Sequence, residues 1–218
     1  MRFSIVTDKT DKNHKIYKEP ASHKNNMGIY KYLKHTWKKP RETLGQDYRQ
    51  KLIKFRREPV TIRVDKPTRL DKARALGYKA KQGIILVRQK ILRGGHQREK
   101  RSGGRRAKNM SPRMTLARNY QTIAEERANK KYKNCEVLNS YLVGQDGKSY
   151  WYEVILIDRD HPAVKADPQL AGIANQKGRV YRGLTSSARK SRGMRRKGKG
   201  AEKVRPSKRK SPSIIRNN

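Results

Sequence analysis

The excess of cationic side chains is the feature that most constrains how this chain can fold. Lys and Arg number 57 against 18 Asp and Glu, which gives a formal net charge of +39 over 218 residues. A chain this basic repels itself unless a polyanion neutralises it, and phosphate backbones suit a mixed Lys/Arg surface. Only 33% of the residues are hydrophobic, so we expect one domain with a core and further segments that a partner orders.

The same sequence disfavours several classes of protein. No apolar run approaches the roughly 18–20 residues that a membrane-spanning helix needs. Cys135 is the single cysteine, which excludes an internal disulfide bond. Residues 1–15 lack the apolar stretch of a secretory signal. We therefore expect a reduced, cytoplasmic setting and neither a membrane nor a small-molecule substrate as partner.

Charge also divides the chain into regions. Residues 135–168 carry three basic and six acidic side chains, whereas residues 177–210 carry fifteen basic side chains and one acid. The first stretch is typical of a globular surface and the second of a phosphate-binding tail. We expect an additional N-terminal extension at 1–26, a helical region at 27–58, a body at 59–176 with a basic glycine-rich loop at 93–108, and a basic RNA-binding tail at 177–218.

Hydrophobic patterns place the strands. Residues 135–143 and 150–157 are rich in β-branched and aromatic side chains, and Asp146-Gly147 between them suits a turn that needs positive φ. They predict a β-hairpin. Residues 84–92 (IILVRQKIL) predict a third strand, and residues 61–64 a fourth strand at the sheet edge.

Helical spacing is clearest at residues 113–132, where Ser111 can cap the helix and Pro112 can take its first position. Further helices are predicted at 41–57, where Leu44, Tyr48, Leu52 and Phe55 recur, and at 28–38, before Pro40. The class is therefore α+β, a small antiparallel sheet with packed helices plus long basic extensions ordered by RNA. The expected core residues are Leu116, Ile123, Val137, Leu138, Val154, Ile155 and Leu156.

Three basic glycine-containing segments are candidates for RNA contact. Residues 76–83 (LGYKAKQG) combine two glycines with Tyr78, Lys79 and Lys81, and form either a backbone approach to sugar-phosphate or a solvated loop. Residues 93–106 form either an RNA-threading loop or a disordered one. In residues 179–193, arginines could grip phosphate while Ser and Thr donate to it, or the segment is a solvated tail. We expect residues 178–218 to be disordered without RNA and to contribute nothing to the core.

Aromatic and acidic residues allow other functions, which we weigh against packing. Trp37, Tyr30, Tyr32 and Tyr48 could stack on bases, although such residues more often pack helices together. A nuclease could place acids at Asp158 and Asp160 beside His161, but a turn after a strand explains them as well. The adjacent Glu125 and Glu126 are expected to balance nearby Arg or Lys, and Cys135 to be a small buried group. The five histidines and Cys135 show no metal-ligand spacing.

Four motifs carry a resemblance to a known family. They are MGIYKYL at 27–33, RLDKARALGYKAKQG at 69–83, VLNSYLVGQDGKSYWYEVILID at 137–158 and RGLTSSARKSRG at 182–193. The chain from Met27 onward resembles the archaeal and eukaryotic ribosomal protein family L-fifteen-e of the large subunit, and the end after Gly200 favours an archaeal member. Family members usually begin at the methionine matching Met27, so residues 1–26 are either a real extension or the product of an upstream start codon chosen in error.

The resemblance implies an α+β body with basic extensions threaded among helices of large-subunit ribosomal RNA, neighbouring ribosomal proteins as partners, no enzymatic activity and no cofactor. It implies RNA contact at Arg74, Lys79 and Lys81 and in the tail. Together with the basic segments above, the candidate RNA-binding residues are Arg69, Lys72, Arg74, Tyr78, Lys79, Lys81, Arg93, Arg98, Arg101, Arg105, Arg106, Arg179, Arg182, Arg189, Lys190, Arg192, Arg195 and Arg196.

Two other functions remain open from the sequence. An RNA-modifying or RNA-cleaving enzyme would need convergent acids or a cofactor loop, and the sequence shows no such group. A DNA-compacting protein would fit the charge, but the tail mixes Arg, Gly and Ser rather than Lys, Ala and Pro. Preference for A-form RNA over duplex DNA would separate the leading hypothesis, a structural ribosomal protein, from the DNA-binding alternative.

Overall fold

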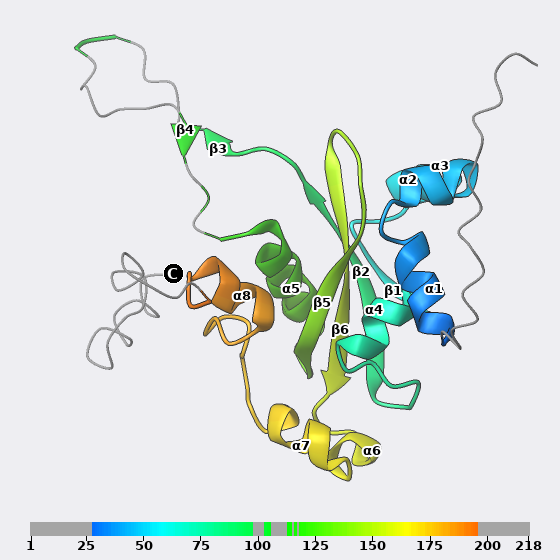
Figure 1. Ribbon diagram of the computed structural model, residues 1–218. Coiled ribbons are helices and arrows are strands. Elements are labelled where there is room, and N and C mark those ends of the chain that lie inside the picture. The colour runs from blue at the N-terminus through cyan, green and yellow to red at the C-terminus, as the bar shows by residue number, and fades with distance from the viewer. Residues whose placement is uncertain (1–27, 98–102, 106–112, 115, 117, 196–218) are drawn as a thin grey trace, which may run out of the picture.

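A four-stranded antiparallel sheet forms the centre of the fold (Figure 1). The computed structural model describes residues 28–97, 103–105, 113–114, 116 and 118–195. The strands are β1 (Thr61–Val64), β2 (Ile84–Leu92), β5 (Cys135–Gln145) and β6 (Ser149–Asp158), in the order β1-β2-β6-β5. All four predicted strands are confirmed, and β1 lies at the edge of the sheet as expected.

The turn of the β5–β6 hairpin closes through a side chain. Asp146 Oδ1 accepts hydrogen bonds from the backbone N–H groups of Lys148 at 2.8 Å and Ser149 at 2.5 Å. The Asp146 N–H donates to the Ser149 carbonyl at 2.9 Å. Gly147 does not adopt positive φ, so that part of the prediction is wrong. The aspartate shapes this three-residue connection, and a two-residue turn with left-handed backbone is not required.

Strand β5 contains two irregularities in its pairing with β6. The register shifts between Val137 and Asn139 and again between Leu142 and Gly144. Val137 pairs with Leu156, and beyond the first shift Ser140 pairs with Val154. Each shift places one extra residue in β5, which is the mark of a β-bulge.

One face of the sheet is covered by α1 (Ile29–Thr36), α2 (Pro40–Thr43), α3 (Gly45–Arg57) and α4 (Leu70–Ala75). The predicted helix at 41–57 is divided at Leu44, because Gly45 has a φ of 44° that a right-handed helix cannot accommodate. The predicted apolar spacing holds within α3. The buried core of this face contains Trp37, Tyr48, Leu52, Phe55, Ala73, Leu86, Tyr141, Val143, Trp151 and Ile155.

The opposite face is covered by α5 (Tyr120–Lys131) and α8 (Ser186–Ser191), which lie side by side in Figure 1. The predicted start of α5 near residue 113 is wrong. Asn119 caps α5, because its side chain accepts a hydrogen bond from the Thr122 N–H at 2.8 Å. Arg113–Met114 instead form β4, which pairs with β3 (His96–Gln97), while Ser111 and Pro112 lie outside the described residues.

Helices α6 (Pro162–Lys165) and α7 (Pro168–Ala174) close one end of the sheet, around Ile157, Val164 and Leu170. None of the helices in the described ranges is both long and apolar enough to cross a membrane.

The core was predicted only in part. Val137, Val154, Ile155 and Leu156 are buried, whereas Leu116, Ile123 and Leu138 are only partly buried. Two buried residues come from the segment that was expected to lie outside the core. Val180 is 1% exposed and packs with Val137 and Val154, and Ala188 is 2% exposed. Residues 178–195, here called the C-terminal segment, are therefore part of the folded body. Residues 196–218 lie outside the described residues.

Candidate nucleic-acid interface

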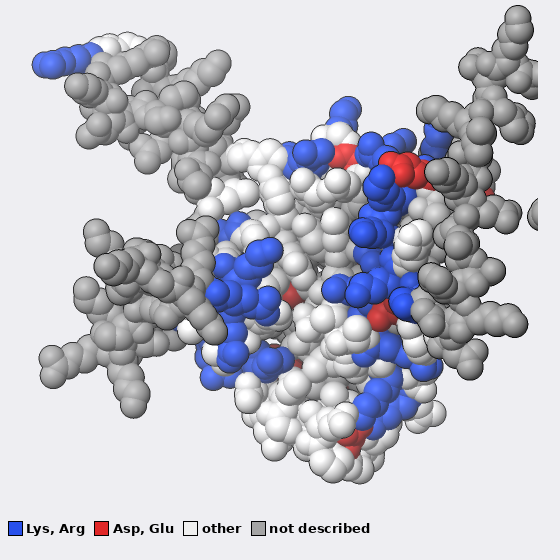
Figure 2. All heavy atoms as spheres, viewed as in Figure 1, with Lys and Arg blue, Asp and Glu red and all other residues white. Residues whose placement is uncertain are grey.

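Cationic side chains gather in two zones of the surface shown in Figure 2. One zone lies over α8 and its surroundings, and the other runs along the side formed by α1, α3 and α4. The surface of the β5–β6 hairpin separates them. Both zones contain residues that the sequence marked as candidates for RNA contact.

The C-terminal segment is anchored to the body at its beginning. Glu136 accepts hydrogen bonds from the backbone N–H groups of Gly178 at 2.6 Å and Arg179 at 3.3 Å. The Arg179 guanidinium donates to the Val137 carbonyl at 2.6 Å. Burial lowers the pKa of Arg179, and the charge of Glu136 opposes this shift. Arg179 thus holds the segment on β5 and has less freedom to reach a phosphate than the sequence suggested.

The remaining cations of the C-terminal segment divide between packing and exposure. Arg192 extends over Gly183 and donates to its carbonyl at 3.3 Å. Gly183 has a φ of 67°, and a Cβ there would lie 2.8 Å from Arg192 Cδ. Arg195 donates to Ser186 Oγ. The candidate cations that remain exposed in this segment are Arg182, Arg189, Lys190 and Arg195.

Polar contacts bind the C-terminal segment to α5. Glu125 is fully buried, and it accepts hydrogen bonds from Thr185 Oγ1 at 2.6 Å and Ser187 Oγ at 3.1 Å. Ser140 Oγ on β5 donates to its other carboxylate oxygen. The expectation that Thr and Ser of this segment bind phosphate is therefore wrong for Thr185 and Ser187, whose hydroxyls face inward. Glu125, Ser140, Thr185 and Ser187 are here called the hydroxyl seam.

The electrostatics of the hydroxyl seam differ from expectation. Burial raises the pKa of Glu125, and the hydroxyl hydrogen bonds and the more distant charge of Arg179 oppose the shift. Glu126 pairs with Arg118, as the sequence predicted for both glutamates. For Glu125 that prediction is wrong, because hydroxyl groups satisfy its carboxylate.

The lysines of the LGYKAKQG motif converge on one carboxylate. Lys79 Nζ and Lys81 Nζ lie 2.7 Å and 2.6 Å from Asp167 Oδ2. These hydrogen bonds hold the pKa of Asp167 well below its ordinary value. The two lysine side chains remain 41% and 32% exposed, so two cations with one opposing charge face the solvent. They stay candidates for phosphate contact.

The glycines of the same motif approach protein side chains. Gly77 has a φ of 98° and Gly83 a φ of 82°, conformations that favour glycine. A Cβ at Gly83 would lie 2.6 Å from Val164 Cγ2, and one at Gly77 would lie 3.1 Å from Leu138 Cδ2. Tyr78 is partly buried against the core on the face of the sheet that α1 to α4 cover. In this structure the motif packs against the body, and its lysines are the part open to solvent.

Cation–aromatic contacts organise the zone around α1 and α4. Arg69 lies 5.2 Å from the Trp37 ring centre, and Arg74 lies 5.6 Å from that of Tyr30. Trp37 and Tyr48 are buried edge to face, which confirms the packing interpretation for this pair. Of the four aromatic candidates, Tyr30 and Tyr32 remain exposed. Lys72 and Arg74 are the exposed candidate cations of α4.

The basic loop at 93–108 leaves the body at a fixed point. Arg93 donates to the Asp146 carbonyl at 2.7 Å and lies 5.0 Å from the Tyr150 ring centre. Tyr120 Oη donates to the Gly94 carbonyl at 2.8 Å and accepts from the Gly94 N–H at 3.0 Å. Beyond this root, Arg105 is exposed. Four candidates lie outside the described residues, namely Arg98, Arg101, Arg106 and Arg196.

Residues considered for catalysis have structural roles. His161 Nδ1 caps α6 by accepting from the Ala163 N–H at 3.2 Å, and Asp158 accepts from the Asp160 N–H at 3.1 Å. Cys135 is buried as expected, and burial raises the pKa of its thiol to about 11. Within the described part of the chain, no three His, Cys, Asp or Glu residues are placed to hold a metal ion.

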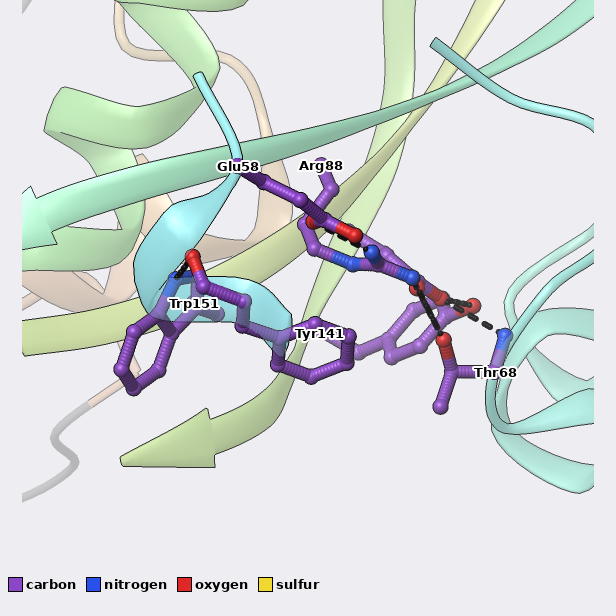
Figure 3. Close-up of polar contacts among 7 residues, drawn as sticks. Glu58, Thr68, Arg88, Tyr141 and Trp151 are labelled. Carbon is purple, nitrogen blue, oxygen red and sulfur yellow. Dashed lines mark hydrogen bonds and ion pairs between the residues drawn. The ribbon is translucent and has the colours of Figure 1, made fainter. Parts of the chain in front are cut away.

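Sequence reasoning missed a buried charged network beneath the α1–α4 zone (Figure 3). Arg88 lies 2.8 Å from Glu58 and 3.2 Å from Glu153. Glu153 also accepts from Tyr141 Oη at 2.6 Å and from the Thr68 N–H at 3.1 Å. These residues are here called the Arg88 network. An arginine inside the apolar run IILVRQKIL was the available signal, because a buried guanidinium requires a partner.

Comparisons with known proteins agree on one family. A sequence model of the family described as "Ribosomal L15" matches residues 28–211. The chain is 50% identical over 182 residues to the "Large ribosomal subunit protein eL15" of Methanocella arvoryzae, covering 82% of this chain and 93% of that protein. The proteins of the same name from Nanoarchaeum equitans and Methanocorpusculum labreanum are both 51% identical, over 84% and 82% of this chain and 97% and 93% of their own lengths. The chain therefore belongs to the Ribosomal L15 family.

Proposed function

We propose that the protein is a structural constituent of the large ribosomal subunit that binds and stabilises folded large-subunit ribosomal RNA. The observation that carries the proposal is the C-terminal segment, which buries Val180 and Ala188 and leaves Arg182, Arg189 and Lys190 exposed. A folded platform that exposes cations suits recognition of phosphates at fixed positions. The family assignment and the name shared by the three archaeal relatives support this role.

Binding by this surface combines charge neutralisation with recognition of shape. Each cation that contacts a phosphate releases condensed counterions, which favours association at low salt. Double-stranded RNA is recognised chiefly through its backbone and its A-form geometry, so cations on a rigid face can match the spacing of phosphates. Because the C-terminal segment is already folded, less conformational entropy is lost on binding than for a disordered tail.

The second basic zone and the loop at 93–108 extend the same function. Lys79 and Lys81 near Asp167, together with Lys72 and Arg74 on α4, would contact RNA on the other side of the hairpin. The loop would enter a crevice between RNA helices from the root that Tyr120 fixes. In the assembled ribosome, neighbouring large-subunit proteins are the further partners. The role is structural and not enzymatic, and it supports translation.

A salt titration tests the proposal directly. Filter binding of the full chain to a transcript of large-subunit ribosomal RNA should give a slope of log K against log salt on the order of −6 or steeper. Replacing Arg182, Arg189 and Lys190 together with Ala should make that slope shallower by about 2, since each lost phosphate contact removes about 0.7 to 0.9.

A control variant and a control nucleic acid test whether the salt dependence is specific to the proposed interface. Lys165→Ala, which removes a cation of α6 that lies 3.8 Å from Asp160 and is not among the candidate contacts, should leave the slope unchanged. Duplex DNA of equal length should bind more weakly than A-form RNA. A slope near zero with the native chain would contradict the electrostatic mechanism, and equal binding to DNA would favour a DNA-compacting protein.

A further inference from the structure

Glu125 is a buried anion inside a very basic protein, and it touches the element that exposes the proposed RNA-binding cations. Its side chain lies on α5 and is 0% exposed. Ser140 donates to one carboxylate oxygen, while Thr185 and Ser187 donate to the other. The carboxylate therefore joins α5, β5 and the C-terminal segment at a single point.

Further hydrogen bonds fix the orientation of α8 on α5. Asn119 Nδ2 donates to the Ser187 carbonyl at 3.0 Å, and the Asn119 N–H donates to Ser191 Oγ at 3.1 Å. Thr122 Oγ1 lies 2.9 Å from Ser187 Oγ. Hydrogen bonds constrain angle as well as distance, so this set fixes how α8 lies on α5.

The fixed side of α8 determines where its exposed side points. Ser187 and Ala188 are the buried residues of this helix, and Arg189 and Lys190 follow them directly in its last turn. A rotation of α8 would therefore move both cations. Thr185 also caps α8 by accepting from the Ala188 N–H at 3.3 Å, so one side chain both starts the helix and binds Glu125.

The chemistry of the donors explains why a carboxylate is suitable at the point where α5, β5 and the C-terminal segment meet. Hydroxyl groups satisfy a carboxylate without consuming cationic side chains, so Arg182, Arg189 and Lys190 stay exposed for an external polyanion. An apolar side chain in place of Glu125 would leave the Thr185 hydroxyl without its acceptor in a buried place, and Ser187 Oγ would keep only its contact with Thr122. A lysine or arginine counter-ion would add repulsion beneath a surface that is already cationic.

We infer that Glu125 is a positioning residue for RNA binding, which acts through Thr185 and Ser187 to hold Arg182, Arg189 and Lys190 in the arrangement that contacts phosphate. The inference rests on the proposed function. Glu125 itself touches no RNA, because it is enclosed by protein on all sides.

The electrostatic sign of a substitution separates positioning from charge. Glu125→Ala removes a negative charge, so general electrostatics alone would strengthen binding to RNA. The positioning role predicts the opposite: affinity for a transcript of large-subunit ribosomal RNA should fall about tenfold, comparable to the loss of one charge-assisted contact. The salt slope should also become shallower, although no cation has been removed. Glu126→Ala, which alters the neighbouring carboxylate on α5, is the matched control and should not weaken binding.

A double-mutant comparison separates positioning from general stability. In a chain that already carries Arg182→Ala, Arg189→Ala and Lys190→Ala, adding Glu125→Ala should cause little further loss of affinity. An equal loss in both backgrounds would overturn the inference, as would unchanged or tighter binding by the single variant. If the triple variant binds as tightly as the native chain, the interface assignment itself fails, and the inference fails with it.

A conservative pair covers the case in which Glu125→Ala does not fold. Thr185→Val removes one hydroxyl at nearly constant volume, whereas Thr185→Ser keeps it. We expect affinity to fall about threefold for the valine variant, equivalent to one neutral hydrogen bond, and to be retained by the serine variant. Equal affinities for the two variants would overturn the inference.

Discussion

The two faces of the sheet each bury a glutamate completely, and they satisfy it in different ways. On the α1–α4 face, Glu153 lies 3.2 Å from the Arg88 guanidinium and accepts from Tyr141 and Thr68. On the α5 face, Glu125 accepts from the hydroxyls of Ser140, Thr185 and Ser187. Both side chains are 0% exposed.

The difference shows two uses of a buried charge. The Arg88 network joins elements of the rigid core, and Arg88 also lies 4.0 Å from the Phe55 ring centre. The hydroxyl seam joins the core to a surface element whose cations face outward. An ion pair is strong but demands that both charges stay buried, whereas neutral donors give a weaker joint. We therefore expect the two faces to differ in stability, in pH response and in the part of the molecule that a substitution loosens.

Breaking the Arg88 network should have the largest effect. Arg88→Met leaves Glu153 buried without its cation, and we expect the free energy of unfolding to fall by about 3–5 kcal/mol, as measured by urea denaturation. Replacing Glu153 with Leu in the same chain should recover part of this loss, since an apolar pair needs no compensation. Arg56→Ala, which removes a pair with Asp146 at the surface, is the control and should change stability by less than about 1 kcal/mol.

Breaking the hydroxyl seam should have an intermediate and more local effect. Glu125→Ala removes the acceptor of buried hydroxyl groups, and we expect the free energy of unfolding to fall by about 1–3 kcal/mol. Amide hydrogen exchange should accelerate first in α8, whereas α3 keeps its protection. Equal acceleration in α3 and α8 would show that the two faces unfold as one unit.

The pH dependence of stability should come from Glu125 in the hydroxyl seam. Its effect on stability should be smaller than that of Glu125→Ala. Burial raises the pKa of Glu125 above its ordinary value of 4.5, so the carboxyl binds a proton more tightly in the folded state. Its contribution to stability is therefore complete below pH 4.5 and declines as pH rises through the folded-state pKa. Glu125→Gln should remove this decline in thermal midpoints measured across that range, and Glu126→Gln should keep it. A Glu125→Gln profile parallel to that of the native chain would contradict the assignment.

Removing exposed cations should have the smallest effect on the free protein. Arg182, Arg189 and Lys190 are exposed, so each replacement by Ala should change stability by less than about 0.5 kcal/mol. The variant that carries all three replacements should be incorporated into large subunits less efficiently in a reconstitution assay. Arg192 is left out of this set because it packs over Gly183. A large drop in the thermal midpoint of the triple variant would mean that the outward cations also stabilise the fold.

The sequence predicted the sheet well because strand formation depends on local pattern. β-branched and aromatic runs located all four strands, and the spacing of Tyr48, Leu52 and Phe55 located the apolar face of α3. Helix α5 was predicted, but its start was placed too early, because Ser111 and Pro112 carry a helix-start signal ahead of the actual cap at Asn119. Its buried polar residues Thr122, Glu125 and Asn129 could not be inferred from an apolar stripe.

The candidate interface could be predicted as a set of cations but not as an arrangement. Composition marks residues 178–195 as basic and poor in apolar side chains, which is also the description of a disordered tail. The contacts that hold this segment on the body, such as the hydrogen bond between Thr185 and Glu125, join residues that are distant in sequence. Charge counting likewise identified Lys79 and Lys81 but could not show that both converge on Asp167.

The irregularity of β5 at Leu138 has a consequence for how the chain can change in length. In a regular strand, alternate side chains share a face, so Val137 and Ser140 would point to opposite sides. The extra residue shifts the alternation by one step, and both then face α5. Deleting Leu138 would remove the extra residue and leave Val137 and Ser140 two positions apart in a regular strand, so Ser140 would still pair with Val154 and Tyr141 with Glu153. A deletion of one residue at this position would therefore keep both buried glutamates in phase with their partners on β5, although each glutamate belongs to a different face of the sheet.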